Sequence, residues 1–346
     1  MMAQHRDITI YDIARELGIS PATVSRGLND HPAVKKITRK KIQDLARELG
    51  YRSNTFASNL RKKRTDTIGV IVPRLSSYFM SNVIAGMEQV ARQEGYNLII
   101  SQSLESLSKE MSNVTTMFNS RVDGLLASLS FETENIRHFE PFLSKGVPVI
   151  FFDRIHEHPQ CMGIVIDNYK AAYDATKHLL QQGCKRIMHI GGNPISHVYA
   201  ERIKGYKKAL HDHKIAVDQK LILTANMSEE AGIEAAQHIL KMKQRPDAVF
   251  SANDACAIYC MLTLKKAGVR IPNDIAFIGF NNDPMSKVVD PTLTTINYPG
   301  YAMGEAAATQ LIAHLNGIST LQATNIIVLR SELIIRDSSL KKKAKS

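Results

Sequence analysis

The sequence predicts an α/β protein: a doubly wound core of two lobes, each built on a parallel sheet, preceded by a small helical unit. From Thr67 onward, short apolar strands alternate with amphipathic helices, and such alternation favours parallel sheets with right-handed crossovers. The strands are too numerous for one sheet, which indicates two lobes. A pair of short capped helices near the N-terminus predicts the separate small unit.

The two N-terminal helices are predicted from their caps. Thr9 is a good N-cap, and Asp12 stands three residues later, at the spacing of a capping box. Gly18 can take the left-handed conformation that a tight turn between helices requires. Ser20 caps the second helix, and Pro21 suits its first position because the missing N–H has no helical partner there. The proline therefore begins a helix and does not break one.

The second helix is predicted over 21–28, with Val24 and Leu28 facing inward at i, i+4 spacing. In a helix-turn-helix unit the N-terminal part of this helix enters the major groove of DNA. Arg26 can then make a bidentate guanine contact, hydroxyl side chains hold phosphates, and small apolar side chains touch thymine methyl groups. A plain helical hairpin with an incidental Arg26 is the alternative. The predicted DNA-contacting residues of this unit are Thr9, Tyr11, Ser20, Pro21, Ala22, Thr23, Ser25, Arg26 and Asn29.

The charge of the chain is unevenly distributed. The net charge is +11, but residues 1–65 carry 14 Lys and Arg against 6 Asp and Glu, whereas residues 66–337 carry 26 against 27. A basic head on a near-neutral body is typical of a nucleic-acid-binding module attached to another domain. The charge therefore favours DNA binding over the plain hairpin. The segment 338–346 adds four lysines and no acid, and we expect it to be a solvated, disordered tail.

A third helix is predicted within 37–51, and Arg39, Lys40 and Lys41 at its start can reach a DNA backbone. The segments TIYDIARELGISPATVSRGLN, TRKKIQDLARELGYRSN and NTFASNLRKKRTDTIGVIVP stand in order along the chain. Together they resemble the head and hinge of the lactose-repressor family of bacterial transcription regulators. The resemblance continues over nearly the whole chain.

The resemblance implies a domain organisation. It places a helix-turn-helix DNA-binding domain at 1–52, a hinge helix at 53–66, and an effector-binding and dimerisation core at 67–337 that is similar to periplasmic sugar-binding proteins. The chain is expected to cross between the lobes near Asp167, Asn297 and Ala323. Lobe one then comprises about 67–166 plus 297–323, and lobe two about 167–296 plus 324–337.

The hinge residues owe their role to the resemblance alone. In the family, two symmetry-related leucines wedge into the minor groove at the centre of the operator, and the matching residue is Leu60, with Ala57 and Asn54 beside it. Unstacking a base step costs a few kcal/mol and is offset by the contacts that a bent duplex permits. An ordinary polar linker is the alternative. The chain departs from the family at Ser53, where proline is usual, and at Lys35, where a capping serine is usual.

Ligand sites in doubly wound sheets lie beyond the carboxyl ends of the strands. The residues that follow the predicted strands are polar, with a few aromatics, and would suit a small polyhydroxylated effector. By the resemblance, the effector-binding positions are Tyr78, Phe79, Asp153, Arg202, Met227, Asn253 and Asn281. Asn281 stands where many members of the family have aspartate. Met227 stands where several members have an aromatic side chain on which the ligand ring packs. For each residue, helix capping or an interlobe ion pair is the alternative, and Asp254 is expected to be structural because an acid in the first turn favours the helix dipole.

Other classes of protein are disfavoured. The sequence contains no G-x-G-x-x-G, G-x-S-x-G or P-loop, so we expect neither an enzyme nor a cofactor. The four cysteines lack redox or zinc spacing and are expected to be reduced core residues. No secretory signal or membrane span is visible, which indicates a cytoplasmic protein. His211 and His213 have strand-like spacing at an expected helix end, so we expect no metal site.

The sequence thus predicts a ligand-responsive transcription regulator, most simply a repressor. It would bind a pseudo-palindromic operator as a homodimer and be switched by a carbohydrate or sugar phosphate between the lobes. The segment after Asp337 has no leucine heptads, which favours a dimer over a tetramer. A solute-binding receptor of a transport system is the alternative, but it has no need of residues 1–65.

Overall fold

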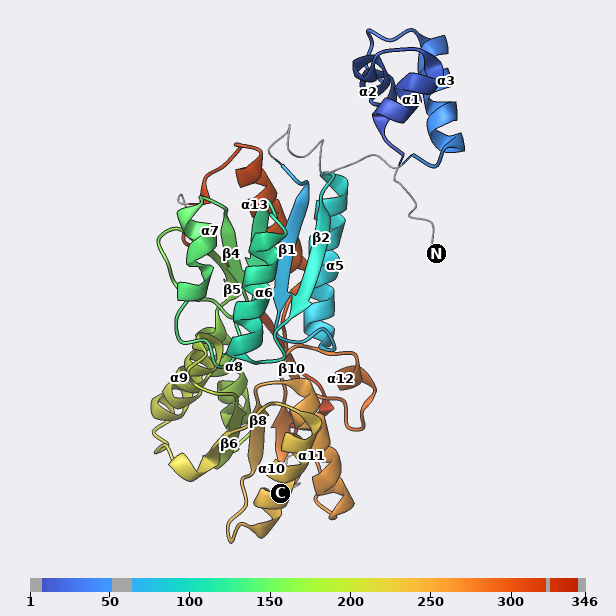
Figure 1. The fold of residues 1–346 in the computed structure, drawn as a ribbon. Coiled ribbons are helices and arrows are strands. Elements are labelled where there is room, and N and C mark those ends of the chain that lie inside the picture. Colours follow the sequence, from blue (N-terminus) through green and yellow to red (C-terminus); the bar gives the residue numbers. More distant parts are fainter. Residues whose placement is uncertain (1–7, 52–63, 322–323, 342–346) are drawn as a thin grey trace, which may run out of the picture. The chain divides into compact units, whose positions relative to one another are not determined.

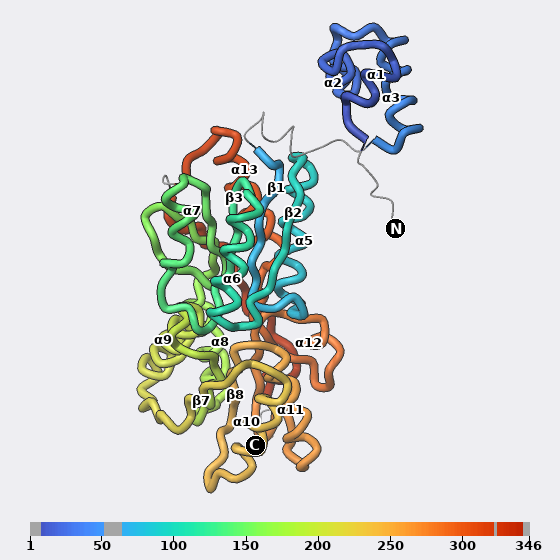
Figure 2. The backbone as a smooth tube through the Cα atoms, viewed as in Figure 1, coloured from blue at the N-terminus to red at the C-terminus, as the bar shows by residue number. Residues whose placement is uncertain are grey.

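The computed structural model describes residues 8–51, 64–321 and 324–341. The chain divides into two compact units, Met1–Thr65 and Asp66–Ser346, which are described separately here (Figures 1 and 2).

The N-terminal unit contains three helices, α1 (Ile10–Leu17), α2 (Pro21–Leu28) and α3 (Lys36–Glu48). The predicted caps are confirmed: Thr9 and Asp12 form the capping box, and Gly18 is left-handed with a φ of 61°. The Ser20 hydroxyl accepts a hydrogen bond from the Thr23 amide at 3.1 Å, and Pro21 is the first residue of α2. Ile13, Val24 and Ile42, one from each helix, are fully buried and form the centre of this small core.

Lobe one of the second unit is built on a six-stranded parallel sheet with the order β11-β5-β4-β3-β1-β2. Alternate residues of β1 face opposite layers: Ile68, Val70 and Val72 pack on the side of α5 and α13, and Ile71 packs on the side of α6 and α7. The strands are β1 (Thr67–Val72), β2 (Asn97–Gln102), β3 (Gly124–Ala127), β4 (Val149–Phe152), β5 (Met162–Ile166) and β11 (Ile326–Leu329), and the helices are α5 (Tyr78–Gln93), α6 (Leu107–Asn119), α7 (Glu140–Ser144) and α13 (Gly300–Leu315).

Lobe two is a four-stranded parallel sheet with the order β7-β6-β8-β9. Its faces are covered by two helix pairs, α8 with α9 and α10 with α11. The strands are β6 (Ile187–Gly191), β7 (Ile222–Thr224), β8 (Ala248–Ser251) and β9 (Ala276–Ile278), and the helices are α8 (Asn168–Gln181), α9 (His197–Asp212), α10 (Glu229–Lys241), α11 (Asp254–Lys266) and the short α12 (Met285–Val288). The predicted doubly wound, two-lobed architecture is confirmed.

The chain passes between the lobes near two of the three predicted positions. The chain passes from β5 into α8 at Asp167, and from β10 (Thr295–Asn297) into lobe one after Asn297. The third crossing does not lie at Ala323, because β11 pairs in parallel with β5 and so extends the lobe-one sheet. The chain leaves lobe one only after Leu329, and β12 (Glu332–Ile334) then pairs antiparallel with β10. Residues 324–329 therefore belong to lobe one and not to lobe two.

The predicted boundary of the C-terminal tail is also wrong. Ser338 and Ser339 are fully buried. The Ser338 hydroxyl donates to the Phe277 carbonyl at 2.8 Å, and the Ser339 hydroxyl lies 2.8 Å from Nε2 of His178. The segment is thus anchored in lobe two at 338 and 339, while residues 342–346 lie outside the described residues. The four cysteines are free and buried, as predicted.

Asp254, the first residue of α11, connects that helix to strand β10 and to the loop at Asp283. Its carboxylate is fully buried and accepts hydrogen bonds from the Thr295 hydroxyl at 2.6 Å and from the Asp283 amide at 2.7 Å. Burial raises the pKa of Asp254 to about 8, because a buried charge lacks the solvation of water. These contacts support a structural role for Asp254.

Helices α5 and α13 approach closely enough that Gly304 has no room for a side chain. A Cβ atom built at Gly304 would lie 1.9 Å from the Val83 carbonyl oxygen. We expect Gly304→Ala to lower the free energy of unfolding by about 1–3 kcal/mol, since overpacking outweighs the better helix propensity of alanine. Thr309→Ala, at an exposed position of the same helix, is the control, and urea denaturation compares the two. Equal stability of Gly304→Ala and wild type would contradict this account of the helix pair.

Asp254 should make stability depend on pH. Between the ordinary carboxyl pKa of 3.8 and about 8, the folded protein keeps this proton and the unfolded chain loses it. The stabilising contribution is therefore complete below about pH 4 and is lost as the pH rises through 8. Asp254→Asn cannot ionise, so its unfolding free energy should fall less between pH 5 and 8.5 than that of wild type.

Asp274→Asn is the matched control for this measurement. Asp274 is paired with Arg270, whose hydrogen bonds hold the pKa of that carboxyl below 3.8, so it titrates below the tested range. The same pH slope in Asp254→Asn and wild type would show that Asp254 does not carry the effect.

Candidate functional site

Residues that follow strands of both lobes meet between the two sheets. Asp153 follows β4, is buried, and has a left-handed φ of 58°. Its Oδ1 accepts a hydrogen bond of 2.6 Å from the hydroxyl of Tyr298, which follows β10 at the second crossing. Burial raises the pKa of Asp153, and the positive charges of Arg154 and Arg202 oppose this shift. A non-glycine residue held at positive φ is strained, and such strain tends to gather at functional sites.

Three aromatic rings surround this hydrogen bond. Tyr298 stacks on Phe79 with ring centroids 4.2 Å apart and meets Phe280 edge-on at 5.8 Å. The guanidinium of Arg202 lies 3.5 Å from the centroid of the Phe280 ring. Phe79 comes from lobe one, Phe280 from lobe two, and Tyr298 from the segment that joins them. The predicted residues Phe79, Asp153 and Arg202 are therefore brought together.

Arg202 is a buried cation with neutral hydrogen-bond partners. Its Nε donates to Oδ1 of Asn168 at 2.9 Å, and Nη1 donates to the Ala252 carbonyl at 2.7 Å. Among the residues that the structure describes, no carboxylate forms an ion pair with it. Desolvation lowers the pKa of Arg202. A buried charge of this kind is costly unless a partner neutralises it, which favours an electron-rich or anionic group of a ligand nearby.

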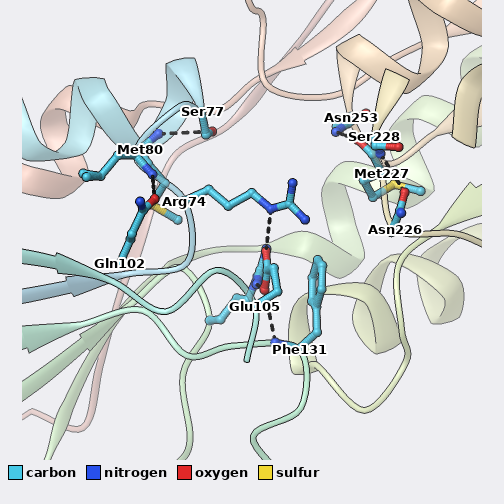
Figure 3. A network of polar contacts seen from close by, with 12 residues as sticks. Arg74, Ser77, Met80, Gln102, Glu105, Phe131, Asn226, Met227, Ser228 and Asn253 are labelled. Atoms are coloured by element: carbon cyan, nitrogen blue, oxygen red, sulfur yellow. Dashed lines mark hydrogen bonds and ion pairs between the residues drawn. The ribbon is translucent and has the colours of Figure 1, made fainter. Parts of the chain in front are cut away.

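The other predicted effector residues have local roles. Asn253 caps α11 through the Cys256 amide at 2.9 Å, and its side-chain amide donates to the Met227 carbonyl at 2.8 Å (Figure 3). Met227 is buried with a φ of 60°, and Asn281 has a φ of 110°. Asn253 is thus a helix cap that also fixes the loop after β7. Tyr78 is half-exposed, unlike its buried neighbour Phe79.

Four residues of lobe one form a second polar group at the same edge of the sheet. Arg154 donates from Nη1 to Oε2 of Glu105 at 2.7 Å, and its guanidinium lies 3.8 Å from the ring centroid of Phe131. Glu105 also accepts the Phe131 amide at 3.2 Å, and Nε of Arg74 lies 3.9 Å from Oε1 (Figure 3). Phe131 in turn meets the Tyr199 ring of lobe two at 5.5 Å.

The sequence interpretation missed Tyr298, Tyr199, Phe280, Phe131 and Glu105 as site residues. Tyr298 carried one available signal, because it directly follows the predicted crossing at Asn297. Phe131 and Glu105 lie several residues beyond the strand ends, and only the folded loops bring them to the site. Their place therefore depends on loop geometry, which the strand pattern does not contain.

The N-terminal unit presents its predicted DNA-contacting residues as a mixed surface. Ala22, Arg26 and Asn29 are exposed on or next to α2, Tyr11 of α1 is 64% exposed, and Pro21, Thr23 and Ser25 are half-buried. Thr9 and Ser20 act as helix caps, and Asn29 donates to the Ser25 carbonyl at 2.8 Å. The predicted hinge residues Asn54, Ala57 and Leu60 lie outside the described residues.

Arg39 has a structural role within the N-terminal unit. Its guanidinium donates to the carbonyls of His31 and Val34 and pairs with Asp30 at 3.5 Å, so it holds the turn before α3. Lys40 and Lys41 are exposed and have no such ties in the described part of the unit.

Within residues 8–51, 64–321 and 324–341, no group of three or more His, Cys, Asp or Glu side chains could hold a metal ion. None of the helices in these ranges is both long enough and apolar enough to cross a membrane.

The chain matches two family models. Residues 9–54 match the bacterial regulatory proteins of the lacI family, and residues 176–339 match the periplasmic binding protein-like domain. The first match covers α1 to α3, and the second begins within α8 and spans most of lobe two together with α13.

Known proteins resemble the chain over most of its length. Catabolite control protein A of Priestia megaterium is 36% identical over 313 residues, which cover 90% of this chain and 93% of the relative. The HTH-type transcriptional repressor CytR of Escherichia coli K12 is 32% identical over 343 residues and 97% of both chains. These relatives are transcription regulators and not enzymes.

Solved structures share the fold. The regulator CcpA of Lactococcus lactis gives a TM-score of 0.73 at 27% identity, covering 80% of this chain and 99% of that one. The CelR–cellobiose complex gives 0.72 at 25% identity, covering 96% and 99%. The lac repressor dimer bound to operator and an anti-inducer gives 0.84 at 24% identity over 97% and 100%, a likeness of fold. With a head of three helices, a two-lobed core and full-length relatives above 30% identity, the chain belongs to the lacI family of bacterial DNA-binding transcription regulators.

Proposed function

We propose that this regulator is a cytoplasmic repressor, that it binds a pseudo-palindromic operator as a homodimer, and that a small effector between its lobes switches it. The effector is a carbohydrate or a sugar phosphate. The observation that carries the proposal is the buried Arg202, without an ion-pair partner in the described part of the chain, beside Asp153 and three aromatic rings. Relatives that match over the full length are transcription regulators, which disfavours the alternative of a solute-binding receptor for transport.

The chemistry of this group suits a sugar. The Asp153 carboxylate can accept hydroxyl hydrogen bonds, the Arg202 guanidinium can donate to ring or hydroxyl oxygens, and the Phe79 and Tyr298 rings offer apolar surface for the face of a pyranose. A neighbour in fold, CelR, forms a complex with cellobiose, which supports a carbohydrate. Met227 and Asn253 would line the lobe-two side, and Tyr78 and Asn281 the entrance.

DNA binding is proposed to use the exposed face of α2. Arg26 reads a base edge, and the exposed Lys40 and Lys41 contact phosphates. The minor-groove wedge of Leu60, with Ala57 and Asn54, follows from the family resemblance. Two heads related by a two-fold axis require half-sites about one helical turn apart.

A homodimer is supported by apolar surface on the edge strand β2. Ile99 and Ile100 of β2 are each 40% exposed, and Leu104 just after the strand is 47% exposed. An exposed apolar edge strand invites pairing or cover by another chain. We propose that a second copy covers this edge.

Arg26→Ala should weaken binding to the selected operator by about 1–3 kcal/mol and relax the preference at one base pair of each half-site. Lys40→Ala should weaken binding to all sequences alike and reduce the slope of affinity against salt by about 1. Operators selected from random DNA by the full-length protein, followed by titration at several salt concentrations, measure both effects. Arg47→Ala, an exposed arginine at the end of α3, is the control. An unchanged sequence preference in Arg26→Ala would remove this residue from base recognition.

A thermal-shift screen of the full-length protein against sugars, sugar phosphates, nucleosides and purine bases should reveal the effector. A ligand at one hundred times its dissociation constant stabilises the folded state by about 2.7 kcal/mol. Asp153→Asn and Arg202→Ala should abolish the shift, whereas Arg270→Ala, an exposed arginine of lobe two paired with Asp274, should keep it. A hit that survives both site substitutions would place the ligand elsewhere.

A further inference from the structure

Four adjacent strands of lobe one bring charged and aromatic side chains to a single edge of the sheet. Arg74 follows β1, Glu105 follows β2, Phe131 follows β3 and Arg154 follows β4, and these strands are neighbours in the order β4-β3-β1-β2. Because the strands are parallel, all four carboxyl ends open on the same side, where ligands bind in such sheets. Figure 3 shows Arg74, Glu105 and Phe131 on one side, with Met227 and Asn253 of lobe two across from them.

The carboxylate of Glu105 is the centre of this group. Its Oε2 accepts from Nη1 of Arg154 at 2.7 Å and from the Phe131 amide at 3.2 Å, and its Oε1 lies 3.9 Å from Nε of Arg74. Two guanidinium groups and one backbone N–H thus converge on one anion. This is the donor set that proteins use for carboxylate and phosphate groups.

The two arginines are held differently. The Arg154 side chain is 12% exposed and is fixed by Glu105, by the Leu129 carbonyl at 3.3 Å and by the face of Phe131. The Arg74 side chain is 47% exposed and touches Glu105 only at the limit of an ion pair. Arg154 is therefore a preorganised donor, and Arg74 is free to turn toward a second anion.

The backbone that presents Glu105 is strained. Leu104 and Glu105 have φ values of 52° and 63°, two successive non-glycine residues in the left-handed region. A left-handed φ is unfavourable for a non-glycine residue and persists only where contacts enforce it. Backbone hydrogen bonds from the Leu104 amide to the Pro73 carbonyl and from the Ser106 amide to the Ser103 carbonyl hold this turn, and the contacts of Glu105 with Arg154 and the Phe131 amide add to them.

We propose that Arg74 and Arg154 form a subsite for a phosphate group of the effector and that Glu105 is a built-in competitor for the same two guanidinium groups. The inference rests on the proposed function, because it places the phosphate on a ligand that binds between the lobes. It also goes beyond it, since it selects a sugar phosphate over a neutral sugar. Binding of the phosphate releases the Phe131 amide from Glu105 and so reaches the ring that contacts Tyr199 of lobe two.

The test is titration of the full-length protein with inorganic phosphate at constant ionic strength. The chain has no tryptophan, so isothermal titration calorimetry is the suitable readout. Glu105→Gln removes the competing charge and should bind phosphate about tenfold more tightly than wild type, a change of about 1.4 kcal/mol. Arg74→Gln alone should not show that gain in phosphate affinity. The double variant Arg74→Gln with Glu105→Gln should lose it.

Arg92→Gln is the matched control. Arg92 is an exposed arginine of α5 that pairs with Glu88 at 3.6 Å, and its removal should leave phosphate binding unchanged. Operator binding of every variant, measured in the same preparations, shows that the protein is folded. A second variant, Glu105→Asp, keeps the charge and should bind phosphate no more tightly than wild type.

Any of three results would overturn the inference. The first is that Glu105→Gln binds phosphate no more tightly than wild type, and the second is that Arg74→Gln does not weaken phosphate binding in the Glu105→Gln background. The third result is equal affinity of wild type for a hexose and for its phosphate ester. Loss of hexose binding in Asp153→Asn together with any of these would leave the proposed function intact and remove only the phosphate subsite. Tighter phosphate binding by Glu105→Gln without a sugar effector in the screen would support the subsite and count against the sugar.

Discussion

The hydrogen bond between Tyr298 and Asp153 is the contact on which the arrangement of the core depends. Tyr298 belongs to the segment that carries the chain back from lobe two into lobe one, and Asp153 ends a central strand of lobe one. The same tyrosine ring stacks on Phe79 of lobe one and meets Phe280 of lobe two. One side chain thus links a crossing segment to both lobes. The bond is short and buried, and its loss would leave a polar group of each partner unsatisfied, which costs more than the bond contributes.

The charges around this bond explain why the site is suited to binding. A core designed only for stability would pair its buried cations or replace them with apolar groups. Here Arg202 lies on the face of Phe280, and within the described part of the chain it donates to the neutral oxygens of Asn168 and Ala252. The face of an aromatic ring attracts a cation, but it does not neutralise the charge. The protein therefore bears a desolvation cost that a polar ligand would offset, as the proposed effector site requires.

Much of the fold, but only part of this site, could be predicted from the sequence. Caps such as Ser20 before Pro21 are local, and strand ends such as Asp153 follow from apolar periodicity, so both were within reach of sequence reasoning. The placement of Tyr298 against Asp153 joins positions 145 residues apart, and no local pattern contains it. The prediction of the third crossing was wrong for the same reason. The short apolar segment of β11 could extend either sheet, and only its long-range pairing with β5 determines that it belongs to lobe one. Asn253 shows another limit, because a polar residue after a strand can cap a helix as readily as it can bind a ligand.

The position of the charged groups also determines which ligands can act as a switch. A ligand shifts a conformational equilibrium only by its difference in affinity for the two states. Asp153 and Arg202 come from different lobes, so in the proposed switch a molecule that contacts both would bind closed lobes better than open ones. Arg74, Glu105 and Arg154 all come from lobe one, so an isolated anion there meets the same donors in either state. It reaches lobe two through the Tyr199 ring, which both Phe131 and the Arg154 guanidinium approach. A phosphate alone would then bind with little effect on the lobes, whereas a sugar phosphate that also spans Asp153 and Arg202 would couple binding to closure, and by linkage to DNA affinity.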